Sequence, residues 1–248
     1  MNVRKIISEY QFYDGKKAVK KLSASQVSRD MLELYLSFTE EPEKGTFGKG
    51  EIGSIFHLGM EEMFKNQPRI VEGEAVQEVR RHKKLSNGWT IDGKSDLVDF
   101  VDDIVFDWKG LSASAYAVLK SNKRDHRINM QMAIYRWLFG VDYAEVHCFI
   151  TNWDPCNATH PASAYQVFKP EMYEPDEIEA IMLEKTTKLG EFLDAKKVPA
   201  KCEDVMPRRL ANGSFINSKC EFYCSYKDSC PKRRDDSAKT LGLSWGRK

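Results

Sequence analysis

The stretch "SDLVDFVDDIVFDWKG", residues 95–110, predicts two strands of a β-hairpin that carry charges where a buried sheet normally carries none. Apolar residues alternate with other residues, as in a strand that buries one face. Charged residues nevertheless interrupt this pattern, among them Asp96, Asp107 and Lys109. Burying such a group costs several kcal/mol unless a partner compensates its charge. We therefore expect these three side chains to interact with one another or with a bound group.

The strand period predicts that the three charges share one face of the hairpin. Asp107 and Lys109 are two residues apart, and the apolar residues around them take the other face. A turn at Val101–Asp102 would place Asp96 opposite Asp107, whereas a turn at Asp102–Asp103 would place it opposite Lys109. Both turns keep the three groups together, because neither changes the parity of the pairing.

Two carboxylates and an ammonium group suit phosphate chemistry with a divalent metal ion. Carboxylate oxygens are the ligands that Mg²⁺ prefers. The ion lowers the pKa of a bound water and balances the charge that builds on a phosphate. A lysine can orient the water or stabilise the transition state. The alternative interpretation is an ordinary Asp–Lys pair across two strands on a solvent-exposed face.

The rest of the chain predicts a mixed α/β domain, because helical and strand patterns follow one another along it. We expect helices near residues 23–38, 52–64 and 125–139 and a long helix that opens at residues 174–176. Further strands are expected at "EAVQEVRR", "AEVHCFIT" and "SAYQVFK". After residue 199 the periodicity ends and cysteines appear. We expect one domain over residues 1–198 and a cysteine-rich tail over residues 199–248, packed on it.

Composition sets bounds on location and partners. The chain has 248 residues, 42% of them hydrophobic, which suffices for one sizeable core. Its net charge is +1, so basic character is local, as at Arg80–Lys84 and Lys227–Arg234. No signal-peptide pattern and no apolar run of membrane-spanning length is present. We therefore expect a cytoplasmic protein.

Four short motifs follow one another in a characteristic order: "GSIFH" at Gly53–His57, "GKSDLVD" at Gly93–Asp99, "DWK" at Asp107–Lys109 and "QMAIY" at Gln131–Tyr135. In these motifs the chain resembles the RecB-like branch of the PD-(D/E)XK nucleases, which includes RecB, AddB, RecE-type exonucleases and the iron–sulfur exonucleases of CRISPR adaptation. The resemblance implies a restriction-endonuclease-like core with a mixed central sheet flanked by helices. Gly110 and Ser95 depart from residues common in the family.

The resemblance also implies roles for individual residues. Asp96 and Asp107 would be metal ligands, with the Trp108 carbonyl and His57 as further ligands, and Lys109 would be the catalytic lysine. The ion would be Mg²⁺ or Mn²⁺, since an imidazole beside carboxylates suits manganese. On one helical face, Arg127, Gln131 and Tyr135 would contact the substrate through phosphate, sugar or base edges. The alternative for this stripe is a plain polar helix face.

The cysteine spacing predicts a second metal site. In a reducing cytosol, Cys220, Cys224 and Cys230, with Cys202 upstream, are better explained as metal ligands than as disulfides. In AddB and the CRISPR exonucleases, which the chain resembles, a similar C-terminal trio holds a 4Fe–4S cluster. No cysteine precedes Cys148 here, so the fourth ligand would be Cys202. Zinc is the alternative, because spacing alone does not distinguish the two metals.

These observations together predict a metal-dependent deoxyribonuclease that hydrolyses phosphodiester bonds. The resemblance implies an exonuclease in recombination, repair or DNA processing, acting on single-stranded DNA or duplex ends, with a recombination protein or helicase as a candidate partner. A structure-specific endonuclease and a catalytically silent DNA-binding subunit are the alternatives. The intact trio of Asp96, Asp107 and Lys109 argues against the silent subunit.

Overall fold

A computed structural model describes residues 20–42, 49–121, 126–200, 202, 207–209, 215–217, 220 and 224–231. The chain divides into two compact units, one of residues 1–28 and 47–184 and the other of residues 29–46 and 185–248. The second unit contains α3 (Met31–Thr39) and a two-stranded sheet of β7 (Pro207–Arg209) and β8 (Phe215–Asn217). The domain boundary expected at residue 198 stays a prediction.

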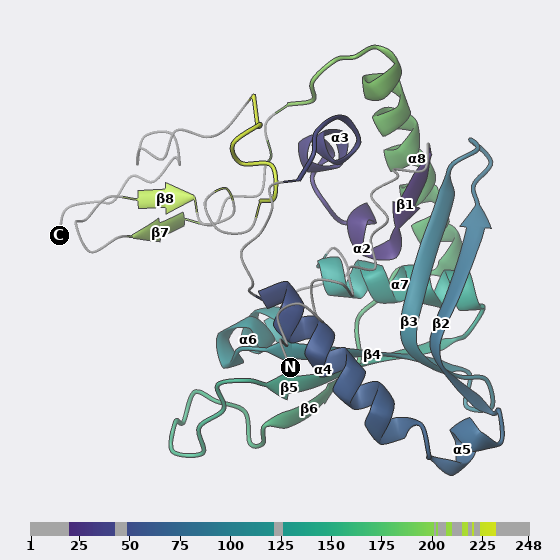
Figure 1. The fold of residues 1–248 in the computed structure, drawn as a ribbon, viewed down its shortest axis with the longest axis vertical. Coiled ribbons are helices and arrows are strands. Elements are labelled where there is room, and N and C mark those ends of the chain that lie inside the picture. Colours follow the sequence, from purple (N-terminus) through teal and green to yellow (C-terminus); the bar gives the residue numbers. More distant parts are fainter. Residues whose placement is uncertain are drawn as a thin grey trace, which may run out of the picture. The chain divides into compact units, whose positions relative to one another are not determined.

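A mixed sheet forms the centre of the first unit (Figure 1). Within the described residues it has six strands in the order β1-β3-β4-β5-β6, with β2 on the other edge of β3. Two pairs, β1 with β3 and β4 with β5, are parallel, and the other three pairs are antiparallel. The strands are β1 (Lys21–Ser23), β2 (Ala75–Lys84), β3 (Thr90–Asp99), β4 (Ile104–Leu111), β5 (Tyr143–Ile150) and β6 (Tyr165–Phe168).

Helices cover both faces of this sheet. Phe64 of α4 stacks on Trp108 with ring centroids 5.2 Å apart, whereas Gln131 of α7 reaches Asp107 at 3.4 Å. Neighbouring residues of a strand point to opposite faces, so α4 and α7 lie on opposite sides of β4. The helices of this unit are α2 (Ala24–Val27), α4 (Lys49–Phe64), α5 (Pro68–Val71), α6 (Ala113–Ser121), α7 (Arg127–Phe139) and the first part of α8 (Pro175–Asp194). The expected mixed sheet flanked by helices is confirmed.

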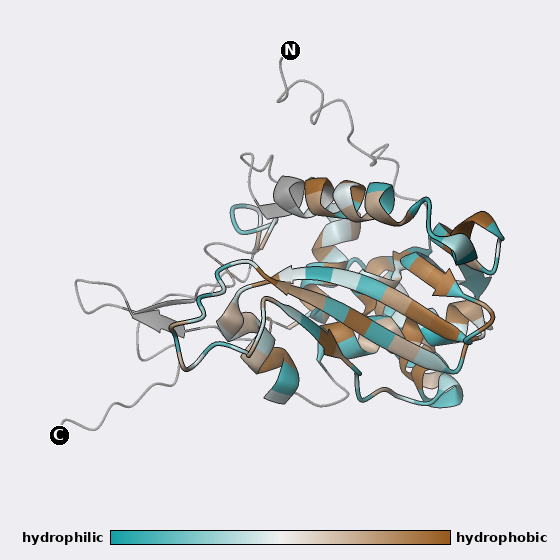
Figure 2. Cartoon of the chain, turned by 90° about the horizontal axis from the view of Figure 1, so that it is seen from below, coloured by the Kyte–Doolittle hydropathy of each residue, from teal (hydrophilic) through white to brown (hydrophobic). Residues whose placement is uncertain are grey.

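Hydropathy follows the alternation expected of the strands, with hydrophobic and hydrophilic residues succeeding one another along them (Figure 2). Leu22, Ile91, Val98, Val105 and Val146 are all 0% exposed and form the core of the sheet. Burial of such side chains supplies about 1.5–3 kcal/mol each. Among the helices of the described part, none combines the length and the apolar character that crossing a membrane would require.

The helix expected over residues 23–38 is in fact two helices. Ser23 begins α2 in a capping box, in which its N–H donates to Gln26 Oε1 at 2.8 Å. The chain then leaves the helical conformation, and Asp30 takes an extended backbone as the residue that begins α3. The expected helix at residues 125–139 is confirmed as α7 from Arg127 onward, while Asp125 lies outside the described residues.

The turn between β3 and β4 has the first of the two expected registers. Leu97, Val98 and Asp99 pair with Phe106, Val105 and Ile104, so the hairpin is centred on Val101–Asp102. Asp99 fixes this turn, because its Oδ1 accepts the N–H groups of Val101 and Asp102, each at 3.0 Å. Burial raises the pKa of Asp99, but these bonds and the Arg69 guanidinium outweigh burial and lower it overall.

The pairing along one edge of β3 is interrupted, and this interruption positions the candidate site. On one edge, β3 pairs with β1 as far as Asp92 and with β4 from Leu97 onward. Residues 93–96 lie between these two ladders, and we call them the strand gap. On the opposite edge, β2 is also interrupted, at Glu78, whose φ of 54° lies in the left-handed region. Asp96 therefore has no register partner in β1, β2 or β4.

Gly93, the first residue of the strand gap, lets α7 approach β3 closely. A Cβ atom there would lie 2.4 Å from Leu138 Cδ1 and 3.1 Å from Tyr135 Cε1. We expect Gly93→Ala to lower the free energy of unfolding by about 1–3 kcal/mol, since the helix must shift to admit the methyl group. Urea denaturation measures this change.

Gly59→Ala is the matched control. A Cβ at Gly59, within α4, would meet nothing within 4 Å. Alanine is favoured over glycine inside a helix by about 0.5–1 kcal/mol, so this variant should be slightly more stable than the wild type. Equal stability of the two variants would contradict the close approach at Gly93.

Candidate active site

The three charged residues of the hairpin come together beside the strand gap. Asp96 and Asp107 are 7% and 2% exposed, on β3 and β4 respectively. Asp96 Oδ2 accepts the N–H of Trp108 at 2.7 Å, so the carboxylate bonds the backbone of β4 beyond the end of the β3–β4 ladder. Extended by one residue beyond its last pair, Leu97–Phe106, the register of the hairpin would place Asp96 opposite Asp107, as one of the two expected turns requires.

His57 joins this group from α4. Its Nδ1 lies 3.0 Å from Asp96 Oδ1, and its side chain is 34% exposed. Phe56, the neighbouring residue, packs edge-on against Phe149 of β5 with ring centroids 5.1 Å apart. This contact and the stacking of Phe64 on Trp108 hold α4 against the sheet on either side of His57.

Lys109 neutralises Asp107. Its Nζ lies 2.6 Å from Asp107 Oδ2, and its side chain is 24% exposed. Burial raises the pKa of Asp107 above its ordinary value, although the Lys109 charge opposes this. Burial also lowers the pKa of Lys109, but the Asp107 carboxylate outweighs burial and raises it overall. Lys109 is therefore a cation beside a buried carboxylate, with part of its side chain open to solvent.

Gln131 and Tyr135 of α7 face the same carboxylates from the other side. Gln131 Nε2 donates to Tyr135 Oη at 2.8 Å and lies 3.4 Å from Asp107 Oδ1. Tyr135 Oη donates to the Lys94 carbonyl at 2.7 Å. Burial and the nearby Asp107 charge raise the pKa of Tyr135, so its hydroxyl stays protonated and able to donate.

Arg127, the first residue of α7, is exposed, and its charge acts on Lys109, whose pKa it lowers. The structure thus brings eight of the residues singled out from the sequence into one neighbourhood: His57, Asp96, Asp107, Trp108, Lys109, Arg127, Gln131 and Tyr135. Their roles stay predictions. Tyr135 differs from expectation in its setting, because it is only 5% exposed and so offers little surface to a substrate.

The sequence profile of the PD-(D/E)XK nuclease superfamily matches residues 66–231, more than half of the chain and including Asp96, Asp107 and Lys109. The chain belongs to the PD-(D/E)XK nuclease superfamily. The matched range of this nuclease extends through Cys230, so the profile also covers the cysteine segment. A search of curated proteins found no match.

One solved structure has a fold similar to that of this nuclease, and two others show a weaker similarity. The crystal structure of SSO0001 is 16% identical, with a TM-score of 0.61, and the match covers 95% of this chain and 98% of that one. A phage-related exonuclease from Haemophilus somnus 129PT has a TM-score of 0.42 at 15% identity, covering 69% and 81% of the two chains. An alkaline exonuclease from Laribacter hongkongensis has a TM-score of 0.45 at 14% identity, covering 72% and 90%.

Nucleases of this superfamily generally use Mg²⁺ or Mn²⁺, and the donor atoms fit such an ion in part. Neighbouring ligands of an octahedral ion at about 2.1 Å stand about 3.0 Å apart. His57 Nδ1 and Asp96 Oδ1 have this separation of 3.0 Å. Both Asp107 oxygens already have neighbours, Lys109 and Gln131. An ion bound by Asp107 must therefore displace or share one of these.

Within the described part of the chain, no three histidine, cysteine or acidic side chains are arranged to hold a metal ion. This statement includes Cys202, Cys220, Cys224 and Cys230, all partly buried in the second unit. Burial raises the pKa of Cys224, and the charges of Cys220 and Cys230 contribute to the same shift. Cys148 is 0% exposed, as expected of a core residue.

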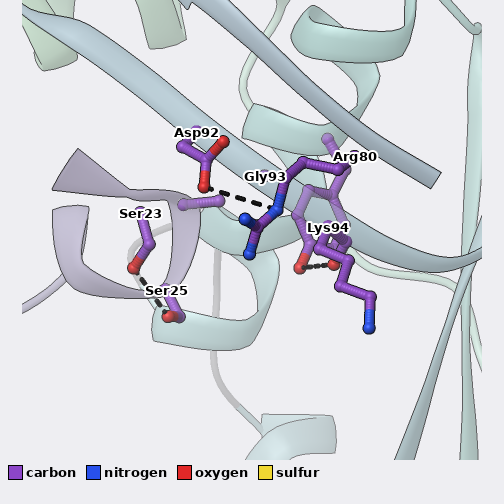
Figure 3. Close-up of a pocket in the computed structure, with 8 residues that line it drawn as sticks. Ser23, Ser25, Arg80, Asp92, Gly93 and Lys94 are labelled. Atoms are coloured by element: carbon purple, nitrogen blue, oxygen red, sulfur yellow. Dashed lines mark hydrogen bonds and ion pairs between the residues drawn. The ribbon is translucent and has the colours of Figure 1, made fainter. Parts of the chain in front are cut away.

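Sequence reasoning missed a pocket beside the strand gap (Figure 3). Its volume is about 190 Å³, and its lining consists of Ser23, Ala24, Ser25, Arg80, Asp92, Gly93, Lys94 and Tyr135. Arg80 Nε lies 3.8 Å from Asp92 Oδ2, and the two serine hydroxyls are 3.2 Å apart. Arg80 pairs with Lys94 across β2 and β3. The basic stretch at residues 80–84 indicated Arg80, but the sequence did not show that Lys94 lies beside it, because that depends on the register between β2 and β3.

Proposed function

We propose that this nuclease hydrolyses phosphodiester bonds of DNA with a divalent metal ion held beside the strand gap. The observation that carries the proposal is the meeting of Asp96, Asp107 and Lys109 with His57, at a site that is open to solvent on the side of His57 and Lys109. Buried acids are retained at such a cost chiefly where chemistry needs them. Membership of the nuclease superfamily supports the same conclusion.

The residues divide the chemistry among them. Asp96, Asp107, His57 and the Trp108 carbonyl would hold Mg²⁺ or Mn²⁺, which would supply a bound water of lowered pKa and positive charge for the phosphate. Lys109 donates a hydrogen bond to the attacking water or to a non-bridging phosphate oxygen. Asp107 orients Lys109 through their ion pair of 2.6 Å. Arg127, exposed at the start of α7, contacts a phosphate of the substrate strand.

Exonucleolytic action at single-stranded or duplex ends, in recombination, repair or DNA processing, is the form of this activity that we propose. It rests on the four motifs shared with the RecB-like branch. Arg80 and Lys94 line the pocket near Asp96, although each already pairs with an acid, Asp92 and Glu78 respectively. Their positive charges support a path for the phosphate backbone beside the candidate site. A structure-specific endonuclease would use the same residues, and only the substrate distinguishes the two.

A metal held by Cys202, Cys220, Cys224 and Cys230 is a separate part of the proposal. Its support is the spacing of the cysteines in the sequence. A 4Fe–4S cluster and a zinc ion both accept four thiolates. Metal analysis of protein purified without oxygen distinguishes about four irons from one zinc per chain.

DNA with labelled ends tests the activity. Purified protein with Mg²⁺ or Mn²⁺ should shorten linear single- or double-stranded DNA from its ends and leave closed circles intact, and EDTA should stop the reaction. Nicking of circles would instead identify an endonuclease. DNA binding without cleavage under any metal would support the silent subunit and overturn the proposed hydrolysis.

A further inference from the structure

We infer that Tyr135 is a positioning residue that holds the two acid-bearing strands at the separation needed for catalysis, with Gln131 as its link to Asp107. The inference rests on the proposed nuclease function and deepens it. It differs from the role expected from the sequence, in which the same two residues contact DNA. The two roles predict different effects on metal affinity and on DNA affinity.

The strand gap is the part of the sheet that needs support. Over residues 93–96, no strand of the described part of the chain pairs with β3 on the edge that faces β4, whereas β2 pairs with residues 93–95 on the opposite edge. Backbone groups in such a place must find other partners, because an unpaired buried donor or acceptor costs about 1–3 kcal/mol. Asp96 depends on this segment for its position, and a displacement of 1 Å between reacting groups can cost a factor of about 10² in rate.

Tyr135 supplies the missing partner. Its hydroxyl donates to the Lys94 carbonyl at 2.7 Å, two residues before Asp96. Its ring packs against Gly93, where a Cβ atom would lie 3.1 Å from Tyr135 Cε1. One side chain therefore fixes β3 at the start of the gap through both a hydrogen bond and a contact. Asp96 closes the other end by accepting the Trp108 N–H at 2.7 Å.

Gln131 extends this support to the second acid. Its amide donates to Tyr135 Oη at 2.8 Å and reaches towards Asp107 Oδ1 at 3.4 Å. The chain of contacts runs from the Lys94 carbonyl through Tyr135 and Gln131 to Asp107. It connects β3 to β4 through α7 at the level where the strands themselves no longer pair.

Burial argues against direct contact of Tyr135 with the substrate. Tyr135 is 5% exposed, and its hydroxyl both donates to Lys94 and accepts from Gln131. A base or sugar could reach the hydroxyl only after these bonds break. The ring contacts both Gly93 and Phe139, with the Tyr135 and Phe139 ring centroids 6.0 Å apart, and at 5% exposure it leaves little surface on which a base could stack.

Tyr135→Phe tests the inference, because it keeps the ring and removes only the hydroxyl. We expect kcat for DNA cleavage to fall by about 10- to 100-fold and the Kd for Mn²⁺, measured by calorimetry, to rise by a similar factor, as for groups that orient metal ligands. KM and the DNA affinity measured in EDTA should stay within about twofold of wild type. Gln131→Met should show a smaller change in the same two quantities.

Tyr116→Phe is the matched control. Tyr116, in α6, is also buried, at 6% exposure, and its hydroxyl reaches only Gln166 Oε1 at 3.4 Å among the contacts of the described residues. It should leave kcat and Mn²⁺ affinity unchanged, and melting temperatures of all variants are compared. Such a comparison separates a general loss of stability from a change at the metal ligands.

Two outcomes would overturn the inference. Weakened DNA affinity of Tyr135→Phe with unchanged Mn²⁺ affinity would assign Tyr135 to the substrate. Unchanged kcat and Mn²⁺ affinity would show that the Tyr135 hydroxyl does not position the metal ligands. Failure of the wild type to cleave DNA would overturn the proposed function instead, and the Mn²⁺ affinities of wild type and Tyr135→Phe would still test whether the hydroxyl positions the ligands.

Discussion

Lys109→Met is expected to lower the turnover of DNA cleavage by about 10²- to 10³-fold, the effect of removing one donor that stabilises developing charge. Methionine keeps the length and apolar stem of lysine but removes the ammonium group. In the folded protein that group lies 2.6 Å from Asp107 Oδ2. Rates under single-turnover conditions, at saturating Mg²⁺, measure the loss directly.

Lys169→Met provides the control for the loss of a lysine from an ion pair. Lys169 Nζ lies 3.3 Å from Glu145 Oε1, and its side chain is 80% exposed. Turnover should be unchanged in this variant. Circular dichroism and the melting temperature verify that Lys109→Met is folded, and wild-type turnover of folded Lys109→Met would refute the assignment of Lys109.

Asp96→Asn is expected to produce the second large effect, a loss of about 10²-fold or more in cleavage at a fixed Mg²⁺ concentration. Asparagine keeps an oxygen that can accept the Trp108 N–H, now 2.7 Å from Asp96 Oδ2, so the hairpin should stay folded. The lost negative charge weakens attraction for the ion, which prefers carboxylate ligands. A titration of activity and of binding against Mn²⁺ should show half-saturation at a higher concentration.

Asp142→Asn serves as the control, because Asp142 is an exposed residue just before β5. It should keep the wild-type metal dependence. A cleavage rate and Mn²⁺ affinity of Asp96→Asn equal to those of the wild type would exclude Asp96 from the metal site. Reduced cleavage with unaltered metal affinity would instead place Asp96 in a role that does not involve the ion.

The sequence alone determined which residues could share a face and in which order the elements follow. Strand alternation put Asp96, Asp107 and Lys109 together, and the helical period put Gln131 and Tyr135 one turn apart. Both periods are set by local backbone geometry and do not depend on how the elements pack. The family motifs likewise pointed to His57, which the structure finds 3.0 Å from Asp96 although the two residues are far apart in the chain.

The register of the hairpin and the burial of Tyr135 depend on tertiary contacts and could not be read from the sequence. The sequence was compatible with both turns. The observed turn is stabilised by Asp99, whose carboxylate contacts Arg69 of α5 and accepts two N–H groups of the turn. The strand gap arises because β1 and β4 take different parts of one edge of β3. No local period encodes where such a shared edge is left open, since that depends on long-range pairing. Tyr135 is buried where α7 packs on β3 at Gly93.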